Sequence, residues 1–315
     1  MENLSEDAIR AIISRYAHLR AAYGADIGAP ELLQPSGEHF PDAFTKDGES
    51  VARLLTRMIG YAPIADDLRV GIRFLEPSDE AGTAAGGGKS CGSGACGTGG
   101  GGGGPRDNVV ELDDGYIVEV ATADAGNGVL LTTNLARSVG AMVLMEAGEE
   151  FDPRELGVLS ELAAVATGFG LLLLNGAYVY GKSCGGVRVH QATCLGLEEL
   201  AVAVALFVRE HDLKPSRARA HMETTQKEAF DDALVWVDSN PEIVAALRSQ
   251  PHALADGMFT IEPIKGPIGR FFAKRKSETP SAKDLATAAT RRKRTPEEER
   301  KLAETKSLVE EALRG

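Results

Sequence analysis

The sequence has few aromatic residues, only four cysteines and no long uninterrupted apolar run. Aromatics make up 5% of the 315 residues, with a single Trp, so a core must be built mainly from Leu, Val, Ile and Ala. The chain opens with a charged amphipathic segment instead of a secretory signal. Its apolar stretch at residues 162–174 is shorter than the roughly 20 residues that a membrane span needs. We therefore expect a cytoplasmic protein without a membrane span, whose cysteines are thiols or metal ligands and not disulfides.

Positive charge is scarce over most of the chain. The net charge is −12, although residues 270–294 contain nine Lys and Arg against two acidic residues. An acidic body argues against a nucleic-acid-binding domain, because phosphate binding needs clustered positive charge. The basic tail is instead a candidate contact for an unknown acidic protein partner, a membrane surface or RNA. Its low apolar content predicts disorder over residues 273–315, with one short helix starting at Thr295-Pro296.

Apolar periodicity predicts a small sheet followed by a mainly helical half. Residues 68–77 alternate like a half-buried strand, and two further strands flank the turn Asp113-Asp114-Gly115 as a hairpin. The apolar segments 130–148 and 155–180 should form two buried helices. We expect a loop over residues 181–194 and further amphipathic helices after it. This order of elements indicates one α+β domain over residues 1–272.

A glycine- and cysteine-rich insert separates the first strand from the hairpin. It covers residues 78–107 and has 12 glycines between residues 86 and 104, so we expect it to be flexible. The pentapeptide Gly-Lys-Ser-Cys-Gly occurs in this insert at residues 88–92 and again at residues 181–185. Each copy therefore contributes a cysteine from a distant part of the chain.

These cysteines predict a metal site. Cys91 and Cys96 form one pair and Cys184 and Cys194 a second, and four thiolates can close a tetrahedral site around Zn²⁺. His190 is a candidate replacement for one ligand. The second pair has C-x9-C spacing, wider than structural zinc sites usually show, so four unlinked thiols are the alternative.

An iron–sulfur cluster is a second cofactor hypothesis. The run Cys91-Gly-Ser-Gly-Ala-Cys96-Gly resembles the start of the [2Fe–2S] loop of molybdenum hydroxylases. Gly99 stands where that loop has its third cysteine, so a complete cluster of this kind is not expected. A different cluster that uses Cys184 or Cys194 stays open.

Common catalytic motifs are incomplete. The insert resembles the end of a P-loop, but Thr83 replaces the first glycine and no helix can follow. Ser90 and Ser183 match G-x-S-x-G without the strand and helix that a nucleophile elbow needs. The six histidines include no H-x3-H pair. The sequence therefore offers no established catalytic constellation.

The order of strands, hairpin and two central helices resembles zincin-type metallopeptidase domains of bacteria, over roughly residues 68–210. In that family the first helix carries H-E-x-x-H and the second supplies an acidic third ligand. The resemblance places Arg137 and Ala141 at the histidine positions, Ser138 at the glutamate that activates water, and Glu161 at the acidic ligand.

Such a site cannot work as a zinc peptidase. Zinc needs neutral imidazoles, and hydrolysis needs a base to take a proton from the bound water. The resemblance therefore implies a degenerate, non-catalytic scaffold or binding protein. The cysteine pairs add a structural metal as a separate expectation. A metal-dependent hydrolase or an iron–sulfur redox protein that uses the cysteine cluster is the alternative.

Overall fold

The computed structural model describes residues 4–65, 67–76, 108–148, 152–183 and 186–262, all of which belong to one compact unit, Met1–Ile264. For residues 181–183 and 186–189 the description is limited to the backbone. The predicted insert, the predicted tail, the domain boundary near residue 272 and three of the four cysteines (Cys91, Cys96 and Cys184) lie outside the described residues.

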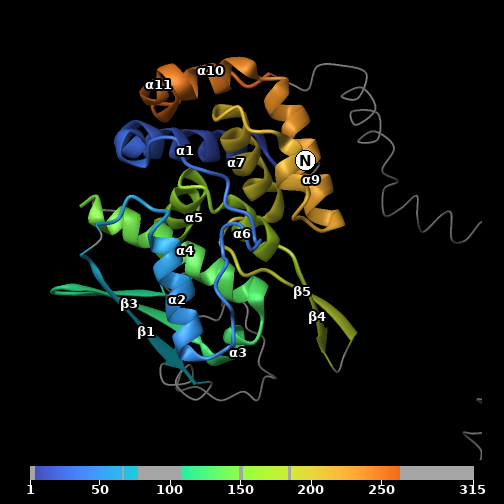
Figure 1. The fold of residues 1–315 in the computed structure, drawn as a ribbon. Coiled ribbons are helices and arrows are strands. Elements are labelled where there is room, and N and C mark those ends of the chain that lie inside the picture. Colours follow the sequence, from blue (N-terminus) through green and yellow to red (C-terminus); the bar gives the residue numbers. More distant parts are fainter. Residues whose placement is uncertain (1–3, 66, 77–107, 149–151, 184–185, 263–315) are drawn as a thin grey trace, which may run out of the picture. The chain divides into compact units, whose positions relative to one another are not determined.

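Helices outnumber strands in this unit, and the strands form two small sheets (Figure 1). This architecture confirms the predicted α+β class. In chain order the elements are α1 (Glu6–Ile27), α2 (Gly48–Ile59), β1 (Arg69–Leu75), β2 (Val109–Leu112), β3 (Gly115–Ala121), α3 (Thr122–Ala125), α4 (Gly128–Glu146), α5 (Leu156–Ala166), α6 (Gly170–Gly176), β4 (Val179–Ser183), β5 (Gly186–His190), α7 (Leu197–Glu210), α8 (Pro215–Arg219), α9 (Thr224–Asp238), α10 (Pro241–Ser249) and α11 (Pro251–Ala255).

The three-stranded sheet has the order β1-β3-β2, with β1 parallel and β2 antiparallel to β3. The predicted strand and hairpin are therefore both present. Tyr116, Val118 and Val120 of β3 are buried and alternate with less buried residues, as one covered sheet face requires. Gly115 begins β3 where a Cβ would lie 2.0 Å from the carbonyl oxygen of Arg69, so the strand pair closes only around glycine.

The first predicted central helix is confirmed as α4. Asn127 caps it, since the Asn127 side-chain oxygen accepts the backbone N–H groups of Val129 and Leu130 at 3.1 and 3.4 Å. Among the described residues α4 is the one helix long and apolar enough to cross a membrane. However, 67% of its apolar window is buried inside the protein, which is typical of a core helix.

The second predicted helix is wrong as a single element, because the chain breaks into α5 and α6. The break lies at Gly168, whose φ of +100° belongs to the left-handed region that favours glycine. A Cβ at Gly168 would lie 2.0 Å from the carbonyl oxygen of Glu31, and the Gly168 carbonyl accepts the N–H of Leu33 at 3.0 Å. The break therefore allows the segment after α1 to pack against the helical core.

The predicted loop over residues 181–194 is also wrong in its first part. The strands β4 and β5 pair in an antiparallel hairpin whose register runs from Val179 opposite His190 to Ser183 opposite Gly186. We call this hairpin the arm; it projects from the helices beside α6 and α7 (Figure 1). After His190 the chain returns to the body through residues 191–196, which we call the return loop, and enters α7.

Candidate functional site

A close crossing of α4 and α5 sets the geometry of the site. A Cβ at Gly140 would lie 2.0 Å from the carbonyl oxygen of Ser160 and 2.9 Å from the backbone nitrogen of Ala164. Only glycine therefore lets the two helix backbones approach this far. Arg137 lies almost one turn before Gly140 on α4, and Glu161 follows Ser160 on α5, so the crossing brings these two side chains together.

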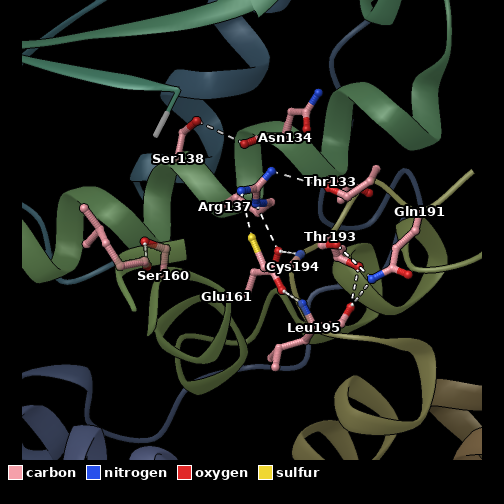
Figure 2. A network of polar contacts seen from close by, with 12 residues as sticks. Thr133, Asn134, Arg137, Ser138, Ser160, Glu161, Gln191, Thr193, Cys194 and Leu195 are labelled. Atoms are coloured by element: carbon pink, nitrogen blue, oxygen red, sulfur yellow. Dashed lines mark hydrogen bonds and ion pairs between the residues drawn. The ribbon is translucent and has the colours of Figure 1, made fainter. Parts of the chain in front are cut away.

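Arg137 and Glu161 form a buried ion pair (Figure 2). The Nε atom of Arg137 lies 3.1 Å from Oε1 of Glu161, and the exposed fractions of the two side chains are 10% and 0%. Charges this deep in a protein are maintained only when they are paired and hydrogen-bonded. Glu161 meets both conditions, because the return loop supplies its remaining partners.

The return loop is held by both members of the pair. The backbone N–H of Cys194 donates to Oε1 of Glu161 at 2.6 Å, and that of Leu195 donates to Oε2 at 2.8 Å. From the other side, Arg137 donates through Nη1 to the Ala192 carbonyl at 3.4 Å and through Nη2 to Sγ of Cys194 at 3.3 Å. Two core helices thereby fix the segment that leads from the arm into α7.

Side chains inside the return loop reinforce its shape. The Thr193 hydroxyl donates to the Leu195 carbonyl at 2.7 Å. The side-chain amide of Gln191 donates to the carbonyls of Thr193 and Leu195, at 3.0 and 3.1 Å. Figure 2 shows these contacts converging with those of Arg137 and Glu161. These contacts within the loop add to those that Arg137 and Glu161 make with it.

Burial controls the protonation of Glu161. Desolvation raises the pKa of the Glu161 carboxyl above its ordinary value, and it outweighs Arg137 and the hydrogen bonds from Leu195 and Cys194, which lower the pKa. The ionised form of Glu161 thus depends on the neighbouring guanidinium and the two backbone donors.

The structure brings together two of the four residues that the zincin resemblance indicates. Arg137 and Glu161 meet, and Cys194 joins them. Ser138 instead donates to the Asn134 carbonyl on its own helix at 3.0 Å, and Ala141 is buried in the core.

The predicted cysteine cluster is placed only in part. His190 ends β5 opposite Val179, at the base of the arm, and is partly exposed. Because Cys91, Cys96 and Cys184 lie outside the described residues, the four-cysteine zinc site and the iron–sulfur cluster stay predictions.

The described side chains do not fit a metal ion at the Arg137–Glu161 pair. A guanidinium already lies 3.1 Å from the Glu161 carboxylate and 3.3 Å from the Cys194 sulfur, and its fixed charge would oppose a divalent cation there. Within the part of the chain that the structure describes, no three His, Cys, Asp or Glu side chains gather as metal ligands. Comparisons with protein-family models, curated proteins and solved structures give no match.

Proposed function

We propose that this protein is a non-catalytic binding protein, in which the Arg137–Glu161 pair holds the arm in place for a protein partner. The observation that carries this proposal is the position of the Arg137 guanidinium, between the carboxylate of Glu161 and the sulfur of Cys194. The guanidinium is a fixed cation beside Glu161, the residue that the zincin resemblance aligns with the acidic metal ligand. Glu161, the carboxylate described at this site, already accepts two backbone N–H groups of the return loop and is thereby engaged in holding the loop.

The arm has features that suit a partner. Tyr180 on β4 is 62% exposed, and its ring packs edge-on against Tyr178 with 5.2 Å between centroids. Tyrosine is enriched at protein interfaces, where it supplies a large rigid contact at small entropic cost. The sheet of the arm has two strands in the described part of the chain, so each strand has an outer edge that can pair with an extended segment.

The base of the arm is anchored at a second point. The side-chain amide of Gln226 on α9 donates to the Tyr178 carbonyl at 2.9 Å. Together with the return loop, this contact fixes both chain ends of the arm to the helical body. A preorganised arm loses less conformational entropy on binding than a free hairpin would. We therefore assign an extended segment of another protein as the partner, added as a strand to the arm.

A photo-crosslinking amino acid at position 180 tests this assignment in cells. The partner identified in this way is then purified and titrated against wild type, Tyr180→Ser and Met258→Ser. Met258 is a matched control, because it is 67% exposed and follows α11, away from the arm. We expect Tyr180→Ser to weaken binding at least tenfold and Met258→Ser to leave it unchanged. Equal binding by all three proteins, or no crosslinked partner, would contradict the proposal.

Elemental analysis with an absorbance spectrum tests the non-catalytic part of the proposal. A hydrolase that uses the zincin-type positions would lose its metal in Glu161→Gln, and an iron–sulfur protein that uses Cys194 would lose its iron in Cys194→Ser. We expect Glu161→Gln to have the metal content of wild type, and we expect none of the three proteins to contain stoichiometric iron. A chelator-sensitive peptidase activity that either substitution abolishes would overturn the proposal.

A further inference from the structure

A second polar cluster lies where three parts of the helical body meet. α1, α7, α10 and α11 gather at the end of the body away from the three-stranded sheet (Figure 1). The C-terminal ends of α1 and α7 and the junction of α10 with α11 border a hollow of about 340 Å³ there. Its lining includes Arg20, Gly24, Glu210, His211, Leu247 and Arg248. These residues have no contact role in the Arg137–Glu161 site.

Glu210 lines the hollow and is the buried counter-ion of Arg20. Its side chain is 3% exposed, and Oε1 accepts a hydrogen bond from Nε of Arg20 at 2.7 Å. Oε2 accepts a hydrogen bond from the hydroxyl of Tyr16 at 2.7 Å. Burial, followed by the neighbouring Glu210 charge, raises the pKa of Tyr16, so this hydroxyl stays protonated and donates. Both carboxylate oxygens of Glu210 therefore already accept hydrogen bonds from side chains of α1.

Among the described residues, Arg20 donates to Glu210 through Nε, on one edge of its guanidinium. Its side chain is 12% exposed, and its Nη1 atom is buried without a hydrogen-bond partner among the described residues. A buried guanidinium N–H without an acceptor is costly, and in a native protein it commonly marks a bound water or ion. A Cβ at Gly24 would lie 3.7 Å from Cζ and 3.8 Å from Nη1 of Arg20. Glycine thus leaves open the space beside the guanidinium.

Arg248 brings a second guanidinium to the same hollow. It donates through Nε to the Glu210 carbonyl at 2.8 Å and through Nη2 to Asp212 at 2.7 Å, and it also donates to the Arg209 carbonyl. Asp212 is 83% exposed, so solvent screens its charge. Burial lowers the pKa of His211, which therefore lines the hollow as a neutral imidazole at pH 7. The guanidinium groups of Arg20 and Arg248 and the carboxylates of Glu210 and Asp212 then define the local charge, and each guanidinium is paired with one of these carboxylates.

We propose that this hollow binds a small organic oxyanion, with its carboxylate or phosphate group between Arg20 and Arg248. Guanidinium groups match the planar or tetrahedral oxygens of such anions and bind them through paired hydrogen bonds. Both guanidinium groups line the hollow, and Leu247 offers an apolar wall for a short carbon chain. A volume of about 340 Å³ is within the range of pockets that bind small molecules. This inference goes beyond the proposed function and is carried by other residues.

Isothermal titration of the full chain with inorganic phosphate and with propionate, at constant ionic strength set by NaCl, tests the proposal. We expect saturable binding of at least one anion with one site per chain, and a rise in the thermal midpoint with its concentration. The two probes distinguish a phosphate ligand from a carboxylate ligand. The absence of any binding beyond the chloride control would overturn the proposal.

Variants that keep the net charge locate the site. Gly24→Leu fills the space beside Arg20 and should weaken binding at least tenfold, whereas Gly24→Ala adds a Cβ at ordinary contact distance and should bind like wild type. Arg20→Lys keeps the charge and removes the forked donor, so it should also weaken binding at least tenfold. Wild-type affinity in either Gly24→Leu or Arg20→Lys would show that anions bind elsewhere, as adventitious ions only.

Discussion

Arg137 and Glu161 carry opposite charges in the protein interior, and each charge is stabilised there by the other. Replacing a buried ion pair by apolar residues is often neutral, whereas removal of one partner leaves an uncompensated charge. Glu161 has an exposed fraction of 0%, so water cannot replace the guanidinium without structural opening. The return loop is therefore held only when both residues of the pair are present. A single polar residue cannot replace them.

The substitution Arg137→Met should lower the free energy of unfolding by about 3–5 kcal/mol, because the Glu161 carboxylate loses its counter-charge in a buried site. Urea unfolding measures this change. Arg53→Met is a matched control, since Arg53 pairs with Glu49 on the surface, with exposed fractions of 43% and 84%, and should cost less than about 1 kcal/mol. Equal effects of the two substitutions would show that the buried pair has no special energetic role.

The effect of Arg137→Met should depend on pH. Burial raises the pKa of Glu161 and Arg137 lowers it, so the pKa of Glu161 is higher in the variant than in wild type. An acid whose folded-state pKa is raised favours folding most when protonated, and its contribution is lost as pH rises through that pKa. The destabilisation by Arg137→Met should therefore be smaller at pH 5 than at pH 8. Urea midpoints at both pH values measure it, and a larger effect at pH 5 would refute the assignment.

At the scale of elements, the crossing of α4 and α5 carries the site. The substitution Gly140→Ala places a Cβ against the Ser160 carbonyl, which lies 2.0 Å away and belongs to the backbone. The helices must separate, at a cost of about 1–3 kcal/mol, and the Arg137–Glu161 contact should loosen with them. Calorimetric unfolding measures the loss. Gly128→Ala on the same helix has nothing within 4 Å of the new Cβ and should be neutral; similar losses in both would contradict the close-crossing account.

The elements that can be predicted from the sequence are those with a clear local period of apolar residues. Val70, Ile72 and Phe74 alternate along β1, and apolar residues recur along the whole of α4, so both could be predicted. The break at Gly168 could not, because its cause is a backbone contact with Glu31, far away in the sequence. In β5, Val187 and Val189 alternate as in a strand. The partner strand Val179–Ser183 contains glycine and polar residues and has no such period, so the hairpin could not be predicted.

The candidate site was predictable only as a list of residues. The sequence indicates Arg137 and Glu161 as positions of a degenerate motif and Cys194 as a candidate metal ligand. Their actual contacts join α4, α5 and the return loop, and Arg137 reaches a carbonyl 55 residues away. Such contacts depend on how helices cross, and the only local trace of the crossing in the sequence is Gly140.

At the scale of the whole molecule, one apolar core connects α4, α5, α6 and α7. Leu172 on α6 is 1% exposed, and its carbonyl accepts the hydroxyl of Thr133 on α4 at 3.0 Å. Leu172→Asp should prevent folding, because an unpaired buried charge costs several kcal/mol. Circular dichroism and gel filtration measure the outcome. Val129→Asp is the control, since Val129 is 39% exposed in the first turn of α4, where an acidic residue is favourable. A folded Leu172→Asp protein would place the core elsewhere.

We propose that the Arg137–Glu161 ion pair holds the return loop without a metal. Hydrogen exchange of the Cys194 and Leu195 amides tests it most directly, since both N–H groups donate to Glu161. The account predicts slow exchange that is the same with and without a chelator, and fast exchange of both amides in Arg137→Met. Protection that disappears on addition of the chelator, or that persists unchanged in Arg137→Met, would contradict it.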